Sequence, residues 1–173
     1  MLASTFRRLV TMDTSDFLES FLQCLEDARV SYCIVGGQAV NAYVEPLVSL
    51  DLDVVVAAGE VGRVEEQLRP RFNVESFPHG LNISRAGSDL RVQIQTDPRY
   101  AGFPRNAETR TVLGRQMAVA SVDDVLRGKV WAASDPTRRG SKRQKDLADI
   151  ARLIEKFPAL RAEVPESLLS KLL

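Results

Sequence analysis

The sequence predicts an α+β (or α/β) domain in which a β-sheet is flanked by helices. Short apolar or alternating segments, which are typical of strands, lie in the first two thirds of the 173 residues. Helical patterns dominate from residue 121 onward. We therefore expect a sheet domain with an N-terminal helix over residues 1–120 and a C-terminal helical segment over 121–173, packed together as one structural domain.

Each element follows from its local pattern. Apolar residues at helical spacing predict an amphipathic helix over residues 13–29. Apolar or alternating runs predict strands at 32–35, 50–57 and 72–77, a hairpin of 81–85 with 90–95, and a short strand within 111–120. Further helices are predicted over 38–43, 60–68, from 121 to about 134, over 141–157 and near 166–172. The third of these helices ends at a break at Asp135-Pro136.

Composition excludes several classes of protein. Lys plus Arg and Asp plus Glu both number 23, so the net charge is zero, which argues against a uniformly basic nucleic-acid binder. Residues 1–100 hold 14 acids and 9 bases, whereas residues 101–173 hold 9 acids and 14 bases. No apolar run approaches the roughly 20 residues of a membrane span. With only two cysteines, a cytoplasmic protein with two buried thiols and no membrane segment is expected.

Two aspartates lie on one side of the predicted strand 50–57. Residues i and i+2 of a strand point to the same face, so Asp51 and Asp53 project side by side. Two carboxylates so close repel each other unless a cation lies between them. Mg²⁺ prefers oxygen ligands and binds one or two carboxylates together with substrate phosphates. The pair therefore predicts a site for Mg²⁺ (or Mn²⁺).

A Gly-Gly pair follows the predicted strand 32–35, with 13 residues between it and Asp51. Glycine allows a sharp turn and a close approach of phosphate to the backbone. A helix that begins just after Gly37 directs free N–H groups at such a phosphate. Together with the aspartates, Gly36 and Gly37 predict a site for a nucleoside triphosphate and its metal.

This combination resembles the signature of the nucleotidyltransferase superfamily, which includes DNA polymerase beta. The residues that carry the resemblance are Val35-Gly36-Gly37 and Asp51-Leu52-Asp53-Val54. The C-terminal stretch from Lys129 to Lys145-Asp146-Leu147-Ala148-Asp149-Ile150 is similar to the helical tail of small bacterial abortive-infection (AbiEii) toxin-type nucleotidyltransferases. The resemblance covers residues 32–153 and implies a mixed sheet flanked by helices.

The resemblance also implies roles for particular residues. Asp51 and Asp53 are expected to bind the metal and to be the catalytic carboxylates, and Gly36 and Gly37 are expected to contact phosphates. Lys129 is expected to bind phosphate. Positioning and charge neutralisation, with little covalent help from the protein, drive this type of transfer.

The third carboxylate of the superfamily lies on a later strand, and here the chain departs from the pattern. In the predicted strand 90–95 the central outward position is Gln93, which offers a metal only its amide oxygen. Asp89 is on the same face but about 13 Å along the strand. Three alternatives remain open: Asp89 substitutes in a different register, the site works with two carboxylates, or catalysis is weakened.

A basic segment opens the predicted helix 141–157. Five cations occur in the eight residues from Arg138 to Lys145. Cations near a helix N-terminus oppose the helix dipole, so their concentration there favours an anionic partner. Lys142 and Lys145 share a face and are candidate ligands of a triphosphate or an RNA backbone. Asp146 and Asp149 are candidates to orient Lys129 or an arginine, or else simply pair with cations on the helix surface.

These features predict a metal-dependent nucleotidyltransferase that moves a nucleotide from an NTP to an acceptor hydroxyl. By resemblance, the acceptor is an RNA or tRNA end or a protein side chain, and the enzyme is of a toxin type. Two alternatives belong to other classes: a catalytically weakened nucleotide- or RNA-binding module of the same fold, and an interaction subunit with a cognate antitoxin.

Overall fold

The computed structural model describes the backbone of residues 2–172 and the side chains of residues 14–172. The chain forms two compact units, each built from two separate stretches of sequence. Unit 1 comprises Met1–Tyr32 and Leu50–Pro104, and unit 2 comprises Cys33–Ser49 and Arg105–Leu173. Among the helices of the described part, none is both long and apolar enough to cross a bilayer. The division of the sequence at residue 120 stays a prediction.

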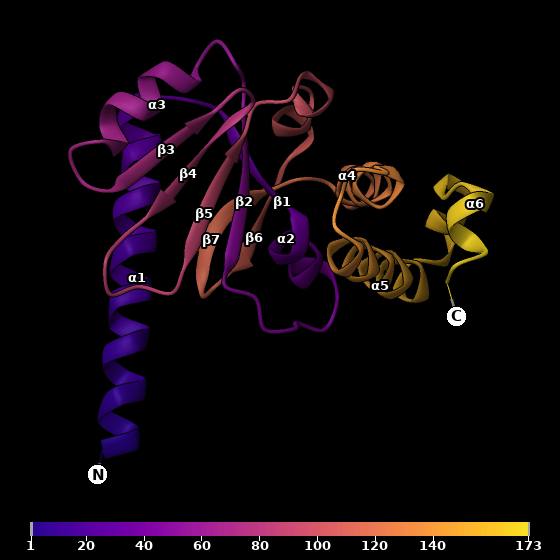
Figure 1. Cartoon of the computed structure of the whole chain (residues 1–173), viewed down its shortest axis with the longest axis horizontal. Coiled ribbons are helices and arrows are strands. Elements are labelled where there is room, and N and C mark those ends of the chain that lie inside the picture. Colours follow the sequence, from indigo (N-terminus) through magenta and orange to yellow (C-terminus); the bar gives the residue numbers. More distant parts are fainter. Residues whose placement is uncertain (1, 173) are drawn as a thin grey trace. The chain divides into compact units, whose positions relative to one another are not determined.

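Unit 1 combines a mixed sheet with two helices. Its strands are β2 (Asp51–Val56), β3 (Asn73–Phe77), β4 (Gly80–Ser84) and β5 (Arg91–Gln95), in the order β3-β4-β5-β2. β2 and β5 are parallel, whereas β4 is antiparallel to both β3 and β5. The helices α1 (Leu2–Ala28) and α3 (Val61–Leu68) contact each other and lie on the same side of these strands (Figure 1).

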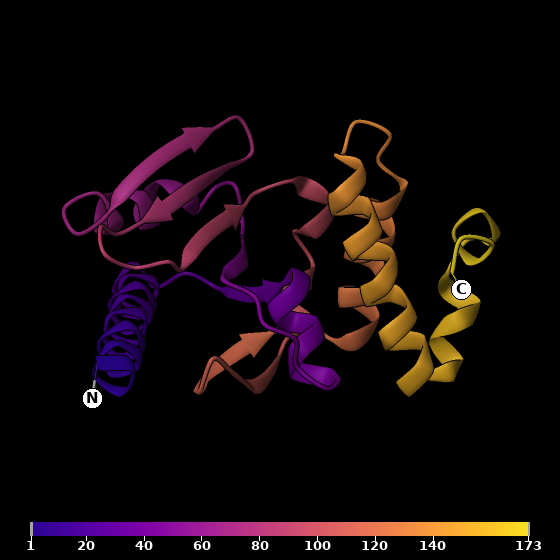
Figure 2. The same ribbon diagram turned by 60° about the horizontal axis from the view of Figure 1, so that its bottom comes forward.

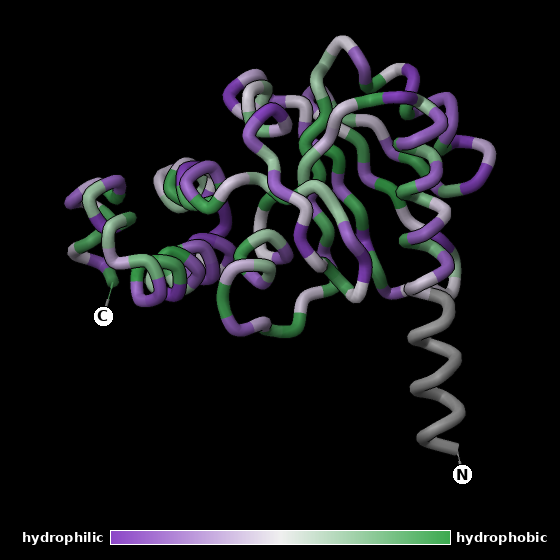
Figure 3. The backbone as a smooth tube through the Cα atoms, turned by 180° about the vertical axis from the view of Figure 1, so that it is seen from behind, coloured by the Kyte–Doolittle hydropathy of each residue, from purple (hydrophilic) through white to green (hydrophobic). Residues whose placement is uncertain are grey.

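The core of unit 1 follows from the alternation of its strands. Leu52, Val92 and Ile94 are at most 1 % exposed and form the core face. Figure 3 shows hydrophobic colour along the inner strands, with hydrophilic colour in the loops and on the helices. Gly80 permits the close approach of β4 to β5, because a Cβ atom there would lie 2.1 Å from the carbonyl oxygen of Ile94. The opposite face of the sheet is consequently left for polar side chains.

Unit 2 is a second mixed arrangement, richer in helix. Its strands are β1 (Tyr32–Val35), β6 (Glu108–Val112) and β7 (Arg115–Val119), in the order β1-β7-β6, with β1 parallel and β6 antiparallel to β7. Its helices are α2 (Gly36–Tyr43), α4 (Val122–Ser134), α5 (Gly140–Lys156) and α6 (Glu166–Leu169). A 3₁₀ helix at Pro158–Glu163 also belongs to unit 2, whereas the 3₁₀ helix at Pro98–Tyr100 belongs to unit 1 and that at Phe103–Asn106 spans the boundary in the sequence.

Helix packing in unit 2 starts from a capped N-terminus. The Ser121 hydroxyl accepts a hydrogen bond of 3.3 Å from the backbone N–H of Asp124, as the predicted capping pattern requires. α4 and α5 then run side by side, with the C-terminal segment packed against them (Figure 2). The Tyr43 hydroxyl at the end of α2 donates a 2.7 Å hydrogen bond to the carbonyl of Ala120. These contacts join α2, β7 and α4 around one core.

The structure confirms the predicted fold class, a mixed sheet flanked by helices, and most of its elements. α2 begins two residues earlier than predicted, at Gly36, so that the glycines form its first turn. β5 begins at Arg91, which places Asp89 in the loop before the strand rather than on it. The strand β6 was not expected, because Glu-Thr-Arg-Thr-Val has few apolar residues to indicate a strand.

Candidate functional site

The two aspartates of β2 lie on its polar face, as the alternation predicts. Leu52 and Val54 between and beside them are completely buried, whereas Asp51 and Asp53 are partly exposed. The parallel pairing of β2 with β5 places Gln93 directly beside Asp53. The register therefore brings a neutral amide, and not a third carboxylate, next to the pair.

Arg91 is the charged neighbour of this pair on β5. It lies beside Asp51 in the register, and its Nε atom is 2.9 Å from Asp51 Oδ1. The Arg91 side chain is 71 % exposed and that of Asp51 is 33 % exposed, so water reaches the ion pair. Alternation placed Arg91 on the correct face, but the strand register that creates this contact is not visible in the sequence. We call Asp51, Asp53, Arg91 and Gln93 the β2–β5 polar group.

The donors of the β2–β5 polar group fit a hard divalent cation. They comprise two carboxylates and one amide oxygen, which are ligands that Mg²⁺ and Mn²⁺ accept. Throughout the part of the chain that the structure describes, no cluster of three or more His, Cys, Asp or Glu side chains is close enough to hold a metal ion. A metal bound here would therefore rest on two carboxylates and complete its coordination with the amide, water or substrate oxygens.

The predicted Gly-Gly pair forms the first turn of α2. Gly36 has a φ of +71°, a left-handed conformation that favours glycine. Val35 precedes the helix and provides no side-chain cap for its first N–H groups. Unsatisfied N–H groups and the positive end of the helix dipole favour an anion at such a position.

Two polar side chains of unit 2 lie close to this turn. A Cβ atom built on Gly37 would lie 3.8 Å from Lys145 Nζ and 3.9 Å from Ser49 Oγ. The structure thus brings together three parts of the sequence: the glycine turn, Ser49 and the basic start of α5. Lys145 and Gly37 were both predicted phosphate ligands, whereas Ser49 was not anticipated, because nothing in its local pattern distinguishes it from a loop serine. We call Gly36, Gly37, Ser49 and Lys145 the α2 turn cluster.

Lys129, by contrast, is buried between α4 and α5. Its side chain is 8 % exposed, and its Nζ atom lies 3.0 Å from Asp146 Oδ1 and 2.8 Å from Asp149 Oδ2. Asp146 and Asp149 contact Lys129 as an orienting role requires, and that role stays a prediction. A phosphate-binding role for Lys129 stays a prediction, and it would require the ammonium group to leave two carboxylates.

Arginines complete the network around Lys129. Arg138 donates from Nε to Asp146 Oδ2 at 2.6 Å, and Arg152 donates from Nη1 to Asp149 Oδ1 at 2.8 Å. Arg152 also donates from Nη2 to the carbonyl oxygen of Glu45 at 2.5 Å, in the loop after α2. This Lys129 network (Lys129, Arg138, Asp146, Asp149 and Arg152) therefore ties α5 both to α4 and to the segment that follows α2.

The remaining cations at the start of α5 differ in environment. Arg138 belongs to the Lys129 network, while Lys142 and Lys145 are exposed. Of the two predicted phosphate-binding lysines of this helix, only Lys145 has the glycine turn as a neighbour in these contacts. A ligand role for Lys142 stays a prediction.

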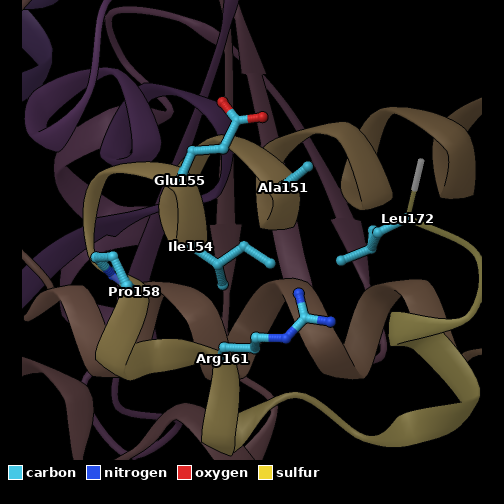
Figure 4. Close-up of a pocket in the computed structure, with 6 residues that line it drawn as sticks. All are labelled: Ala151, Ile154, Glu155, Pro158, Arg161 and Leu172. Carbon is cyan, nitrogen blue, oxygen red and sulfur yellow. The ribbon is translucent and has the colours of Figure 1, made fainter.

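A pocket lies elsewhere in unit 2, between α5 and the C-terminal segment (Figure 4). Its volume is about 250 Å³, and its lining is formed by Ala151, Ile154, Glu155, Pro158, Arg161 and Leu172. None of these residues belongs to the predicted site, and the lining is mostly apolar. We therefore place the candidate chemistry in the β2–β5 polar group and the α2 turn cluster.

Comparisons with known proteins place this geometry in a known fold. No family model and no curated protein matches the sequence. Among solved structures, the antibiotic-resistance factor ANT(2'')-Ia in complex with adenylyl-2''-tobramycin has a TM-score of 0.62 at 15 % identity, covering 93 % of this chain and 97 % of that one. Its solution structure gives a TM-score of 0.61 at 16 % identity over 89 % of this chain and 91 % of that one.

A second protein supports the same conclusion. The lincomycin-bound lincosamide antibiotic adenylyltransferase LnuA has a TM-score of 0.53 at 13 % identity, covering 79 % of this chain and 95 % of that one. Similarity to solved structures at sequence identities this low establishes a shared fold only. The chain described here therefore has a nucleotidyltransferase-like fold.

Proposed function

We propose that this protein is a metal-dependent nucleotidyltransferase that moves a nucleotide from an NTP to an acceptor hydroxyl. The observation that carries the proposal is the placement of Asp51 and Asp53 on one partly exposed strand face, in a chain with this fold. Arg91 already pairs with Asp51, but two carboxylates side by side still favour a bound cation. A ligand-binding role explains why this strand carries them.

The roles of the residues follow from their chemistry. Asp51 and Asp53 would hold Mg²⁺ or Mn²⁺, which when bound neutralises charge on the triphosphate and on the pyrophosphate leaving group. In the α2 turn cluster, backbone N–H groups at Gly36 and Gly37 would donate to phosphate oxygens. Lys145 would add a positive charge and Ser49 a hydroxyl donor.

We also propose an enzyme type, an acceptor, a partner and a location for this protein. These are a toxin-type enzyme similar to the AbiEii group, an acceptor that is an RNA or tRNA end or a protein side chain, a cognate antitoxin, and a cytoplasmic location. The resemblance of the sequence over residues 32–153 supports the first three, and the two buried, unpaired cysteines support the location. Co-purification with a small neighbouring protein would support the antitoxin partner.

Transfer of label from radioactive NTPs tests the proposed activity. The full chain is incubated with each of four α-labelled NTPs, Mg²⁺ or Mn²⁺, and panels of RNAs, tRNAs, proteins and small hydroxyl compounds. We expect incorporation with the native chain and none with Asp51→Asn. Glu66→Gln, which removes one negative charge from the exposed surface of α3, is the matched control and should retain the activity. Absence of incorporation under every condition would contradict the proposal.

Gln93 favours one second candidate, a nucleotide-binding module with weakened catalysis. The amide beside Asp53 supplies no negative charge for a metal ion. Calorimetry that finds NTP binding without transfer, together with transfer restored in Gln93→Asp, would support this second function over the first.

A further inference from the structure

The ion pair between Arg91 and Asp51 bears on how the proposed metal would bind. The guanidinium lies 2.9 Å from one of the two carboxylates, at the neighbouring position of the parallel strand pair. A side chain in this place neutralises Asp51 before any metal arrives. A metal ion that uses Asp51 must therefore displace Arg91 or share the carboxylate with it.

The charge balance of the β2–β5 polar group limits the number of ions. Two carboxylates, one guanidinium and one neutral amide sum to a single negative charge. A pair of divalent ions about 3.5–4 Å apart carries four positive charges and relies on carboxylates that bridge them. The neutral amide of Gln93 next to Asp53 does not provide such a bridge. When Arg91 is displaced, the two carboxylates carry two negative charges and balance one divalent ion.

We propose that Arg91 is a built-in cation that competes with a divalent metal for Asp51, so that the site takes a single ion. This inference rests on the proposed function, since it assumes that Asp51 and Asp53 hold the metal. Arg91 then supplies, as a fixed part of the protein, charge neutralisation that a second ion would otherwise bring. The consequence is a metal affinity set by the Arg91–Asp51 ion pair.

Titration of the full chain with Mn²⁺ in the absence of nucleotide tests this inference. Free Mn²⁺ is followed by electron paramagnetic resonance, and binding is repeated by calorimetry at low ionic strength. The native chain should bind one Mn²⁺. Arg91→Gln should bind it about fivefold more tightly, because an exposed ion pair contributes up to about 1 kcal/mol. Arg91→Lys keeps a cation at this position and should bind Mn²⁺ less tightly than Arg91→Gln.

Arg99→Gln is the matched control. It removes the same charge from the same unit, but Arg99 pairs with Asp97, at 3.0 Å, beyond the end of β5. Its effect on Mn²⁺ affinity should stay below about twofold, since water and salt screen charges that do not touch the site. Addition of Asp51→Asn to Arg91→Gln should abolish the gain.

Several outcomes would overturn the inference. They are two Mn²⁺ ions per native chain, an Arg91→Gln gain no larger than that of Arg99→Gln, a gain that survives Asp51→Asn, or no Mn²⁺ binding by any variant. These readouts measure binding alone. A chain that transfers no nucleotide but shows the Arg91→Gln gain would contradict only the proposed function, whereas transfer without that gain would contradict only this inference.

Discussion

The β2–β5 polar group and the Lys129 network contain similar residues in opposite environments. Each has two aspartates and at least one cation. Asp51 is 33 % exposed and its partner Arg91 is 71 % exposed, whereas Asp146, Asp149 and Lys129 are 1 %, 4 % and 8 % exposed. A buried charge must be paired inside the protein, because its hydration has been lost. A partly exposed carboxylate keeps access to ions and substrates.

Because of this difference in exposure, aspartates and cations have different roles in the two regions. The Lys129 network holds α4, α5 and the loop after α2 in one arrangement, and Lys145 of the α2 turn cluster immediately precedes Asp146 on α5. The β2–β5 polar group is partly exposed, so that ions and substrates can reach it. Burial therefore separates the structural charges of this protein from its candidate ligand-binding charges better than residue identity does.

The largest expected effect is on stability. Lys129→Met should lower the free energy of unfolding by about 3–5 kcal/mol, because it leaves two carboxylates buried without their shared cation. Asp53→Asn, the comparison variant in the β2–β5 polar group, should change it by less than about 0.5 kcal/mol. Urea denaturation followed by circular dichroism measures both. Similar losses in the two variants would remove the distinction between the regions.

The sequence predicted one side of this comparison better than the other. Asp51 and Asp53 were placed correctly because strand alternation is a local property with a period of two residues. The contact of Lys129 with Asp146 and Asp149 was anticipated, but its burial was not, since it depends on how α4 packs against α5. A lysine with helical neighbours resembles any surface lysine until that packing is known.

The other features that the sequence did not predict also depend on contacts between distant residues. β6 has little apolar content, and its hairpin turn uses Leu113, which adopts a left-handed φ of +50° that is uncommon for leucine. Ser49 and Arg91 acquire their roles from contacts with the glycine turn and with Asp51, respectively. Local patterns determine which elements form and which face is polar, whereas the register and helix packing that complete a site are non-local.

A smaller effect is expected for Lys145 in the α2 turn cluster. Lys145→Met should weaken the binding of a non-hydrolysable NTP about tenfold, as expected for the loss of one charge-assisted contact. Its free energy of unfolding should change little, in contrast to Lys129→Met, because Lys145 is exposed. Lys171→Met, in the exposed C-terminal turn, is the charge-matched control for calorimetry. Equal affinities of the two variants would exclude Lys145 from the phosphate site.

The smallest effect compares the two cysteines, one in each unit. Burial raises the pKa of Cys33 from 9.0 to about 12, with a further contribution from the charge of Asp124. Burial also raises the pKa of Cys24, but the nearby Arg71 guanidinium opposes this shift. A thiol that stays protonated in the folded chain and ionises in the unfolded chain stabilises the fold fully below pH 9, and this contribution is lost as the pH rises toward 12.

The expected difference between the native chain and the cysteine variants lies in how steeply the free energy of unfolding falls with pH, and not in its value at one pH. Between pH 8.5 and 10 the native chain should lose about 1 kcal/mol more of its free energy of unfolding than Cys33→Ala does. The cavity left by the substitution lowers stability at every pH and so does not affect the slope. Cys24→Ala should change the slope less, because Arg71 favours the thiolate in the folded chain. Parallel curves for the native chain and Cys33→Ala, from urea titrations at each pH, would show that the Cys33 thiol is open to water. They would also weaken the argument that burial separates the structural polar groups of this protein from its candidate ligand-binding groups.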